Sequence, residues 1–80
     1  MMKYVYILQS LADAERFYTG MTENPDALLK KHNAGQVPHT SKFMPWRIKT
    51  FIGFSDEDSA VAFEKYLKSA SGRAFAKKRL

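Results

Sequence analysis

The sequence contains no cysteine, which excludes both a disulfide framework and a zinc site built on thiolates. No apolar run approaches the roughly 18 residues of a membrane-spanning helix, so we expect no membrane partner. The amino terminus lacks a basic segment followed by a long apolar one, which argues against a secretory signal. Internal repeats, linkers and low-complexity segments are also missing. These absences predict a cytoplasmic protein with one domain, residues 1–80.

What the chain does have is basic charge and aromatic residues. Its formal net charge is +5, and part of that charge lies in a cluster near the end, at Arg73, Lys77, Lys78 and Arg79. A basic domain attracts polyanions, mainly through phosphate contacts, although the same charge also keeps many small proteins soluble. With 45% hydrophobic and 14% aromatic residues, the composition is typical of a folded domain.

Three apolar segments favour β-strands. Residues 3–9 (KYVYILQ) are rich in β-branched and aromatic residues, and residues 16–20 (RFYTG) follow closely enough to form an antiparallel hairpin. Residues 46–54 (WRIKTFIGF) begin with alternating apolar and polar residues, which indicates a third strand. Because side chains alternate along a strand, the first strand would place Tyr4, Tyr6 and Leu8 on one face, and Val5 and Ile7 on the other.

Helix signals occupy the rest of the chain. Asn24 and Pro25 are typical of a helix start, and Gly35 follows the expected end near Asn33. Leu28 and His32 are four residues apart and would share one face of this helix.

A second helix should start at residues 55–58 (SDED), and a short third one should occupy residues 73–79 after a break at residues 71–72. The buried stripe of the second helix would comprise Ala60, Phe63, Leu67 and Ala70. The predicted order is ββαβαα. The fold class is therefore α+β, with a three-stranded antiparallel sheet flanked by helices.

Several short motifs occur in a fixed order along nearly the whole chain. They are Tyr4-Val5-Tyr6, Tyr18-Thr19-Gly20, His32-Asn33-Ala34-Gly35, Thr40-Ser41-Lys42, Pro45-Trp46 and Glu64-Lys65. This set resembles the GIY-YIG nuclease superfamily, and in particular its small stand-alone bacterial members. The element order ββαβαα is also that of the GIY-YIG fold, so the resemblance supports the predicted architecture.

The resemblance implies a metal-dependent endonuclease that hydrolyses phosphodiester bonds, with DNA as the first candidate substrate. Glu64 would hold one ion, Mg²⁺ or Mn²⁺, which coordinates a phosphate oxygen. Tyr6 and Tyr18 would orient or deprotonate the attacking water, and His32 would assist proton transfer or hold the phosphate. From their charge and position, the candidates for contacting nucleic acid are Lys31, Lys42 and Arg47.

One position departs from the family pattern. Members of this superfamily normally carry an arginine four residues before the helix histidine, where it clamps the phosphate, but this chain has Leu28. A leucine offers neither charge nor a hydrogen-bond donor. Whether the protein is an active enzyme is therefore open: it is a weakened nuclease or, alternatively, a degenerate domain that binds nucleic acid or a protein partner without cutting.

Each candidate residue also has a purely structural interpretation. Tyr6 and Tyr18 could be ordinary sheet aromatics, and Glu64 could form a surface ion pair with Lys68. His32 could cap a helix end through the helix dipole. Trp46 follows a proline, which favours a core anchor over a platform for stacking bases. The sequence leaves the oligomeric state open.

Overall fold

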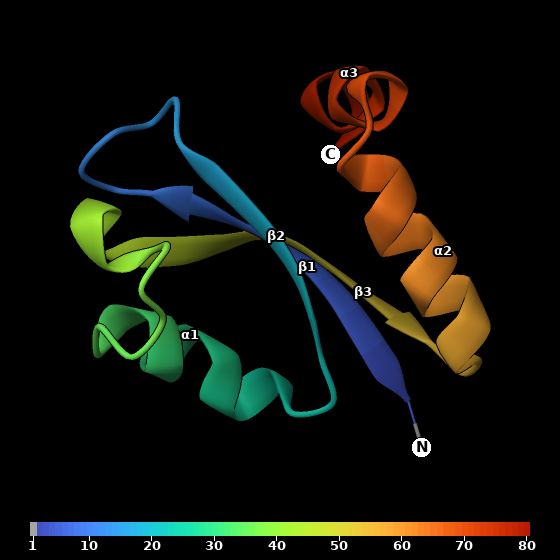
Figure 1. Ribbon diagram of the computed structural model, residues 1–80, viewed down its shortest axis with the longest axis horizontal. Coiled ribbons are helices and arrows are strands. Elements are labelled where there is room, and N and C mark those ends of the chain that lie inside the picture. Colours follow the sequence, from blue (N-terminus) through green and yellow to red (C-terminus); the bar gives the residue numbers. More distant parts are fainter. Residues whose placement is uncertain (1) are drawn as a thin grey trace.

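The computed structural model describes residues 2–80 and arranges them in the order ββαβαα (Figure 1). Residue 1, which belongs to the predicted domain 1–80, lies outside the described residues. The elements are β1 (Lys3–Ser10), β2 (Phe17–Thr22), α1 (Pro25–Asn33), a short 3₁₀ helix (Ser41–Phe43), β3 (Trp46–Phe54), α2 (Glu57–Leu67) and α3 (Ala70–Arg79). The predicted α+β class and element order are confirmed. Among residues 2–80, no helix has the length and apolar character needed to cross a membrane.

The sheet has the strand order β2-β1-β3, with β1 antiparallel to both neighbours. Tyr6 at the centre of β1 lies opposite Gly20 of β2 on one side and Phe51 of β3 on the other. β2 is thus an edge strand, and no strand within residues 2–80 pairs with its outer side.

Two hydrophobic cores form on opposite faces of β1, as the alternation of its residues predicts. Tyr6 and Leu8 pack with Leu28 of α1 and with Trp46. On the other face, Val5 and Ile7 pack against the helices α2 and α3, where the main partners are Ala60, Leu67 and Ala76. Figure 1 shows α1 on one side of the sheet and α2 with α3 on the other. Burying one such aliphatic side chain contributes about 1.5–3 kcal/mol, so both layers stabilise the fold.

Helix α1 begins and ends where the sequence predicts. The Asn24 side chain accepts a hydrogen bond from the backbone N–H of Asp26 at 3.2 Å, and Pro25 fills the first turn. Beyond the end of α1, Gly35 has a φ of +74°, a conformation that glycine adopts without strain. Leu28 and His32 are the two buried residues of this helix, which confirms that they share one face.

Helix α3 differs from the prediction at its start. It begins at Ala70, and the Ser69 side chain caps it by accepting a hydrogen bond from the N–H of Gly72 at 3.1 Å. The predicted break at residues 71–72 is therefore wrong, and Ala70 is exposed in α3 instead of buried on the stripe of α2. Gly72 lies inside α3. A larger residue would not fit at this position, because a Cβ there would collide with the Tyr66 carbonyl and lie 2.7 Å from the Leu67 Cα. The glycine permits close helix packing instead of breaking the helix.

Candidate active site

Three predicted site residues from three different elements converge on one face of the sheet. The Tyr6 hydroxyl of β1 lies 3.0 Å from Nε2 of His32 in α1. The ring of Tyr18 in β2 lies 5.1 Å from the His32 ring and 6.4 Å from the Tyr6 ring, measured between centroids. Together with Leu28 and Lys31, these residues line a cleft of about 360 Å³. The resemblance predicted the three residues, and the structure places them side by side.

A chain of hydrogen bonds runs through His32. The Thr40 hydroxyl lies 3.2 Å from the carbonyl of Val37, which can only accept, and 2.9 Å from Nδ1 of His32. If the Thr40 proton goes to Val37, Nδ1–H of His32 donates to the Thr40 oxygen, and Nε2 is left as an acceptor. Tyr6 then donates its hydroxyl proton to Nε2. Every polar group of this chain is satisfied, and the bond at one ring nitrogen sets the role of the other.

Burial controls the ionisation of this pair. Burial, together with the smaller effects of the charges of Tyr18 and Glu64, raises the pKa of Tyr6 to about 12. Burial also lowers the pKa of His32, and the neighbouring charge of Lys31 adds to that decrease. Near neutral pH, Tyr6 therefore carries its proton and His32 is uncharged. The Tyr6 hydroxyl thus points its proton at a neutral imidazole.

Gly20 makes room for the tyrosine, a role that the sequence does not disclose. A Cβ at Gly20 would lie 2.6 Å from Cζ of Tyr6 and 3.1 Å from the ring of Tyr18. Gly20 is also the residue of β2 that pairs with Tyr6. The Tyr6 ring can thus lie across the backbone of β2 toward the edge of the sheet. The sequence showed Gly20 only as the glycine of the second motif. Its role in making room for Tyr6 follows from the strand register.

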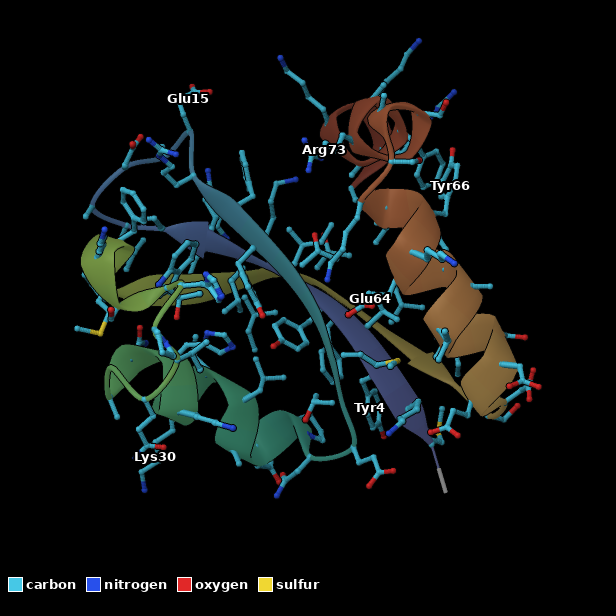
Figure 2. All side chains as sticks on the ribbon, in the orientation of Figure 1. Tyr4, Glu15, Lys30, Glu64, Tyr66 and Arg73 are labelled. Carbon is cyan, nitrogen blue, oxygen red and sulfur yellow. The ribbon has the colours of Figure 1, made fainter. Side chains whose placement is uncertain are left out.

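Glu64 approaches from the other layer of the molecule. It lies on α2, and Figure 2 shows its carboxylate turned toward the sheet. Its side chain is 22% exposed and forms an ion pair with Lys68 at 3.6 Å, so the predicted surface pair is present. Glu64 does not join the hydrogen bonds of Tyr6 and His32, but its charge acts on the Tyr6 hydroxyl.

A lone carboxylate fits a magnesium site of a particular kind. Within residues 2–80, no three His, Asp or Glu side chains are grouped to hold a metal ion. Mg²⁺ often binds through one or two carboxylates, with substrate phosphates and several waters as its other ligands. Glu64 is partly exposed and its charge reaches Tyr6, so it could serve as the protein ligand of such an ion.

The other predicted residues are more dispersed. Leu28 is only 4% exposed, packs with Tyr6 and lines the cleft, so the position that departs from the family pattern does face the site. Lys31 is exposed and lines the same cleft. Lys42 and Arg47 are exposed but do not line it, and the guanidinium of Arg47 donates a hydrogen bond to Gln9.

Trp46 and Asn33 fix the loop that carries Thr40. The buried Trp46 donates its indole N–H to the Thr40 carbonyl at 2.8 Å, which confirms its interpretation as a core anchor. Asn33 follows His32 and holds the backbone of Trp46 twice, accepting from its N–H at 2.6 Å and donating to its carbonyl at 3.1 Å. The sequence offered Asn33 only as part of a motif, with no indication of this contact.

Replacing Thr40 by valine should disturb the tautomer of His32 without filling or emptying much space. The buried Nδ1–H loses its acceptor, which costs about 1–3 kcal/mol of stability. ¹⁵N NMR of the His32 ring should show a reduced Nδ1–H population, and thermal unfolding should occur earlier. Ser41→Ala is the matched control, because the Ser41 hydroxyl contacts the Pro38 carbonyl at 3.0 Å instead of His32. An unchanged ring spectrum in Thr40→Val would refute the assigned tautomer.

Comparison with known proteins agrees with this geometry. Residues 2–79 match the GIY-YIG catalytic domain family, so the chain belongs to this family. Its fold resembles the solution structure of the UPF0213 protein BH0048 from Bacillus halodurans. That comparison has a TM-score of 0.60 and 32% sequence identity, and it covers 96% of this chain and 81% of that one. The predicted superfamily and fold are therefore confirmed.

Two longer relatives carry functional names. The chain is 38% identical over 65 residues to a structure-specific endonuclease subunit SLX1 homolog from Giardia intestinalis, covering 76% of this chain and 18% of that protein. It is 34% identical over 71 residues to the structure-specific endonuclease subunit SLX1 of Debaryomyces hansenii, covering 80% of this chain and 20% of that protein. The chain thus spans about a fifth of the length of these relatives.

Proposed function

We propose that this domain is a metal-dependent endonuclease that hydrolyses phosphodiester bonds in nucleic acid, with DNA as its first candidate substrate. The observation that carries the proposal is the buried hydrogen bond of 3.0 Å between Tyr6 and His32 beside an open cleft. The charge of Glu64 acts on the same hydroxyl. The names of the SLX1 relatives support nuclease chemistry in this family.

The Tyr6–His32 pair provides a route for the proton of the attacking water. Because the pKa of Tyr6 is about 12, a free tyrosinate is unfavourable at neutral pH. The water instead gives its proton to the Tyr6 oxygen while Tyr6 passes its own proton to Nε2 of His32. One proton thus moves from water to imidazole while the water oxygen bonds to phosphorus. The P–O bond to the leaving strand breaks, and the leaving oxygen takes up a proton from solvent. Positioned proton transfer of this kind contributes about 10²–10⁴ in rate.

Glu64 and Tyr18 complete the site in this proposal. A divalent ion held by Glu64 would supply Lewis-acid stabilisation of the phosphate charge. Tyr18 lines the cleft next to His32 and would orient the water. Lys31 is the cation of the cleft and would attract the phosphate, although a lysine cannot reproduce the two parallel hydrogen bonds of an arginine.

Leu28 favours a second candidate function. It faces the cleft and brings no charge to it, so the domain could bind nucleic acid or a protein partner while cutting slowly or not at all. Nucleic-acid affinity that falls steeply with salt, combined with no detectable cleavage, would support this alternative.

Removal and return of the metal tests the proposal directly. The purified domain should cut DNA in Mg²⁺ or Mn²⁺, lose the activity in a chelator, and regain it when the ion is restored, because the ion would neutralise phosphate charge. Cleavage of a labelled branched DNA and of a plain duplex, resolved on denaturing gels, gives the measurement. Activity must co-elute with the protein in gel filtration. Chelator-resistant cutting would contradict the metal-dependent mechanism.

A further inference from the structure

A second and larger groove lies on the opposite face of the sheet from the Tyr6–His32 pair. Its volume is about 870 Å³, and its walls come from the β1–β2 hairpin, the start of β2 and the helix α3. Of its lining residues, only Tyr18 belongs to the predicted site. Its charged lining residues are Glu15, Arg16, Lys49, Lys68, Arg73 and Lys77.

The groove is strongly basic, since five of these six side chains are cations. Arg16 is partly neutralised by Asp13 at 3.4 Å, and Lys68 by Glu64 at 3.6 Å. Arg73 and Lys77 form no ion pair within residues 2–80. They are four residues apart on α3 and therefore project from the same side of it. In Figure 2, Arg73 lies on the side of α3 that faces the hairpin carrying Glu15.

Two residues connect this groove to the candidate active site. Tyr18 lines both the groove and the smaller cleft that contains His32. Lys68 lines the groove and pairs with Glu64, the proposed metal ligand. The groove thus leads from α3 to the edge of β2. There it reaches both Tyr18 and the ion pair of Glu64.

An exposed aromatic residue in the groove indicates single-stranded rather than double-stranded nucleic acid as the ligand. Phe17 at the start of β2 is 51% exposed, and the Lys49 ammonium lies 5.7 Å from the centre of its ring. Cations that follow a groove, together with an aromatic ring open to stacking, are typical of sites that bind single strands. A paired base offers no free face to such a ring.

We propose that this basic groove binds an unpaired nucleic-acid strand and leads its backbone to the edge of β2. The phosphates contact Arg73 and Lys77, and a base stacks on Phe17. The inference rests on the proposed nuclease function, since it names the form of substrate and its path into that site. It is tested by binding alone, without metal, so that cleavage does not enter the measurement.

The decisive comparison uses two double variants of the same helix. R73Q/K77Q removes two groove cations that form no ion pair within residues 2–80, whereas K78Q/R79Q removes two neighbouring cations that do not line the groove. Both lower the net charge from +5 to +3, because 11 basic residues remain against 8 acidic ones. Fluorescence anisotropy with a labelled oligothymidine and with a duplex, in a chelator at several salt concentrations, gives the affinities.

We expect R73Q/K77Q to bind the single strand about tenfold or more weakly, with a salt slope reduced by about 1.4, or 0.7 for each lost phosphate contact. K78Q/R79Q should change the affinity less than about threefold. Phe17→Leu should weaken single-strand binding about tenfold through lost stacking. Equal losses in the two double variants, or tighter binding of the duplex than of the single strand, would refute the proposal that this groove binds an unpaired strand. If the groove binds as expected but wild type never cuts, the proposed function falls while the binding site stands.

Discussion

Changing Glu64 to glutamine should lower the cleavage rate by about 10³-fold or more while the domain stays folded. Glutamine keeps the size of the side chain but loses the negative charge that would hold the divalent ion. The ion pair with Lys68 is also lost, yet its members are 22% and 52% exposed, and such surface pairs contribute little stability. Rates with saturating Mg²⁺, together with thermal unfolding, separate a chemical effect from a structural one.

Glu57→Gln provides the matched control, since Glu57 lies on the same helix and pairs with Lys3 at 3.3 Å. The control should retain nearly full activity. A second measurement does not depend on cleavage. Because the Glu64 charge contributes to the raised pKa of Tyr6, spectroscopic titration should show a lower tyrosine pKa in Glu64→Gln but not in the control. If both variants cut equally well, the ion is held elsewhere and Glu64 is only a surface ion-pair residue.

Local rules predicted the elements of this fold because each signal lies within a few residues. Alternation along residues 3–9 assigned Tyr6 and Val5 to opposite faces, and the two cores confirm it. Helix α1 likewise begins after the Asn24 cap and ends before Gly35, as expected. The same local rules gave a wrong prediction at Gly72. They placed a helix break there, because glycine is ordinarily unfavourable inside a helix. The close approach of the α2 carbonyl at Tyr66 is a tertiary contact that no local pattern contains.

The candidate site likewise has a part that the sequence predicted and a part that depends on tertiary contacts. The resemblance selected Tyr6, Tyr18 and His32, and the structure brings them together. The Thr40 contact with His32 could not be foreseen, because it depends on how the loop is anchored by Trp46. The sequence showed the cluster that contains Arg73 and Lys77, but it could not predict the groove, because the other cations come from the β1–β2 connection, from β3 and from the residue after α2.

Replacing Leu28 by arginine should raise the cleavage rate by about 10²–10³-fold, the usual effect of one positioned electrostatic stabiliser of a transition state. Leu28 is buried, but it lines the cleft on the same side of α1 as His32. The aliphatic stem of an arginine can cover the leucine's packing surface while its guanidinium reaches into the cleft. A planar fork there would hold two phosphate oxygens beside the proton route of Tyr6 and His32.

Two further substitutions at this position isolate the cause of any gain. Leu28→Met keeps the apolar packing and adds no charge, so its rate should match wild type. Leu28→Lys adds a charge without the two parallel donors, and its gain should fall clearly below that of arginine. Thermal unfolding must show all three variants folded before single-turnover rates on a labelled DNA are compared. A folded Leu28→Arg protein with the wild-type rate would show that the missing arginine does not limit catalysis. Either the site would then differ from an active one at positions other than Leu28, or the cleft would not accommodate an arginine in the clamping geometry.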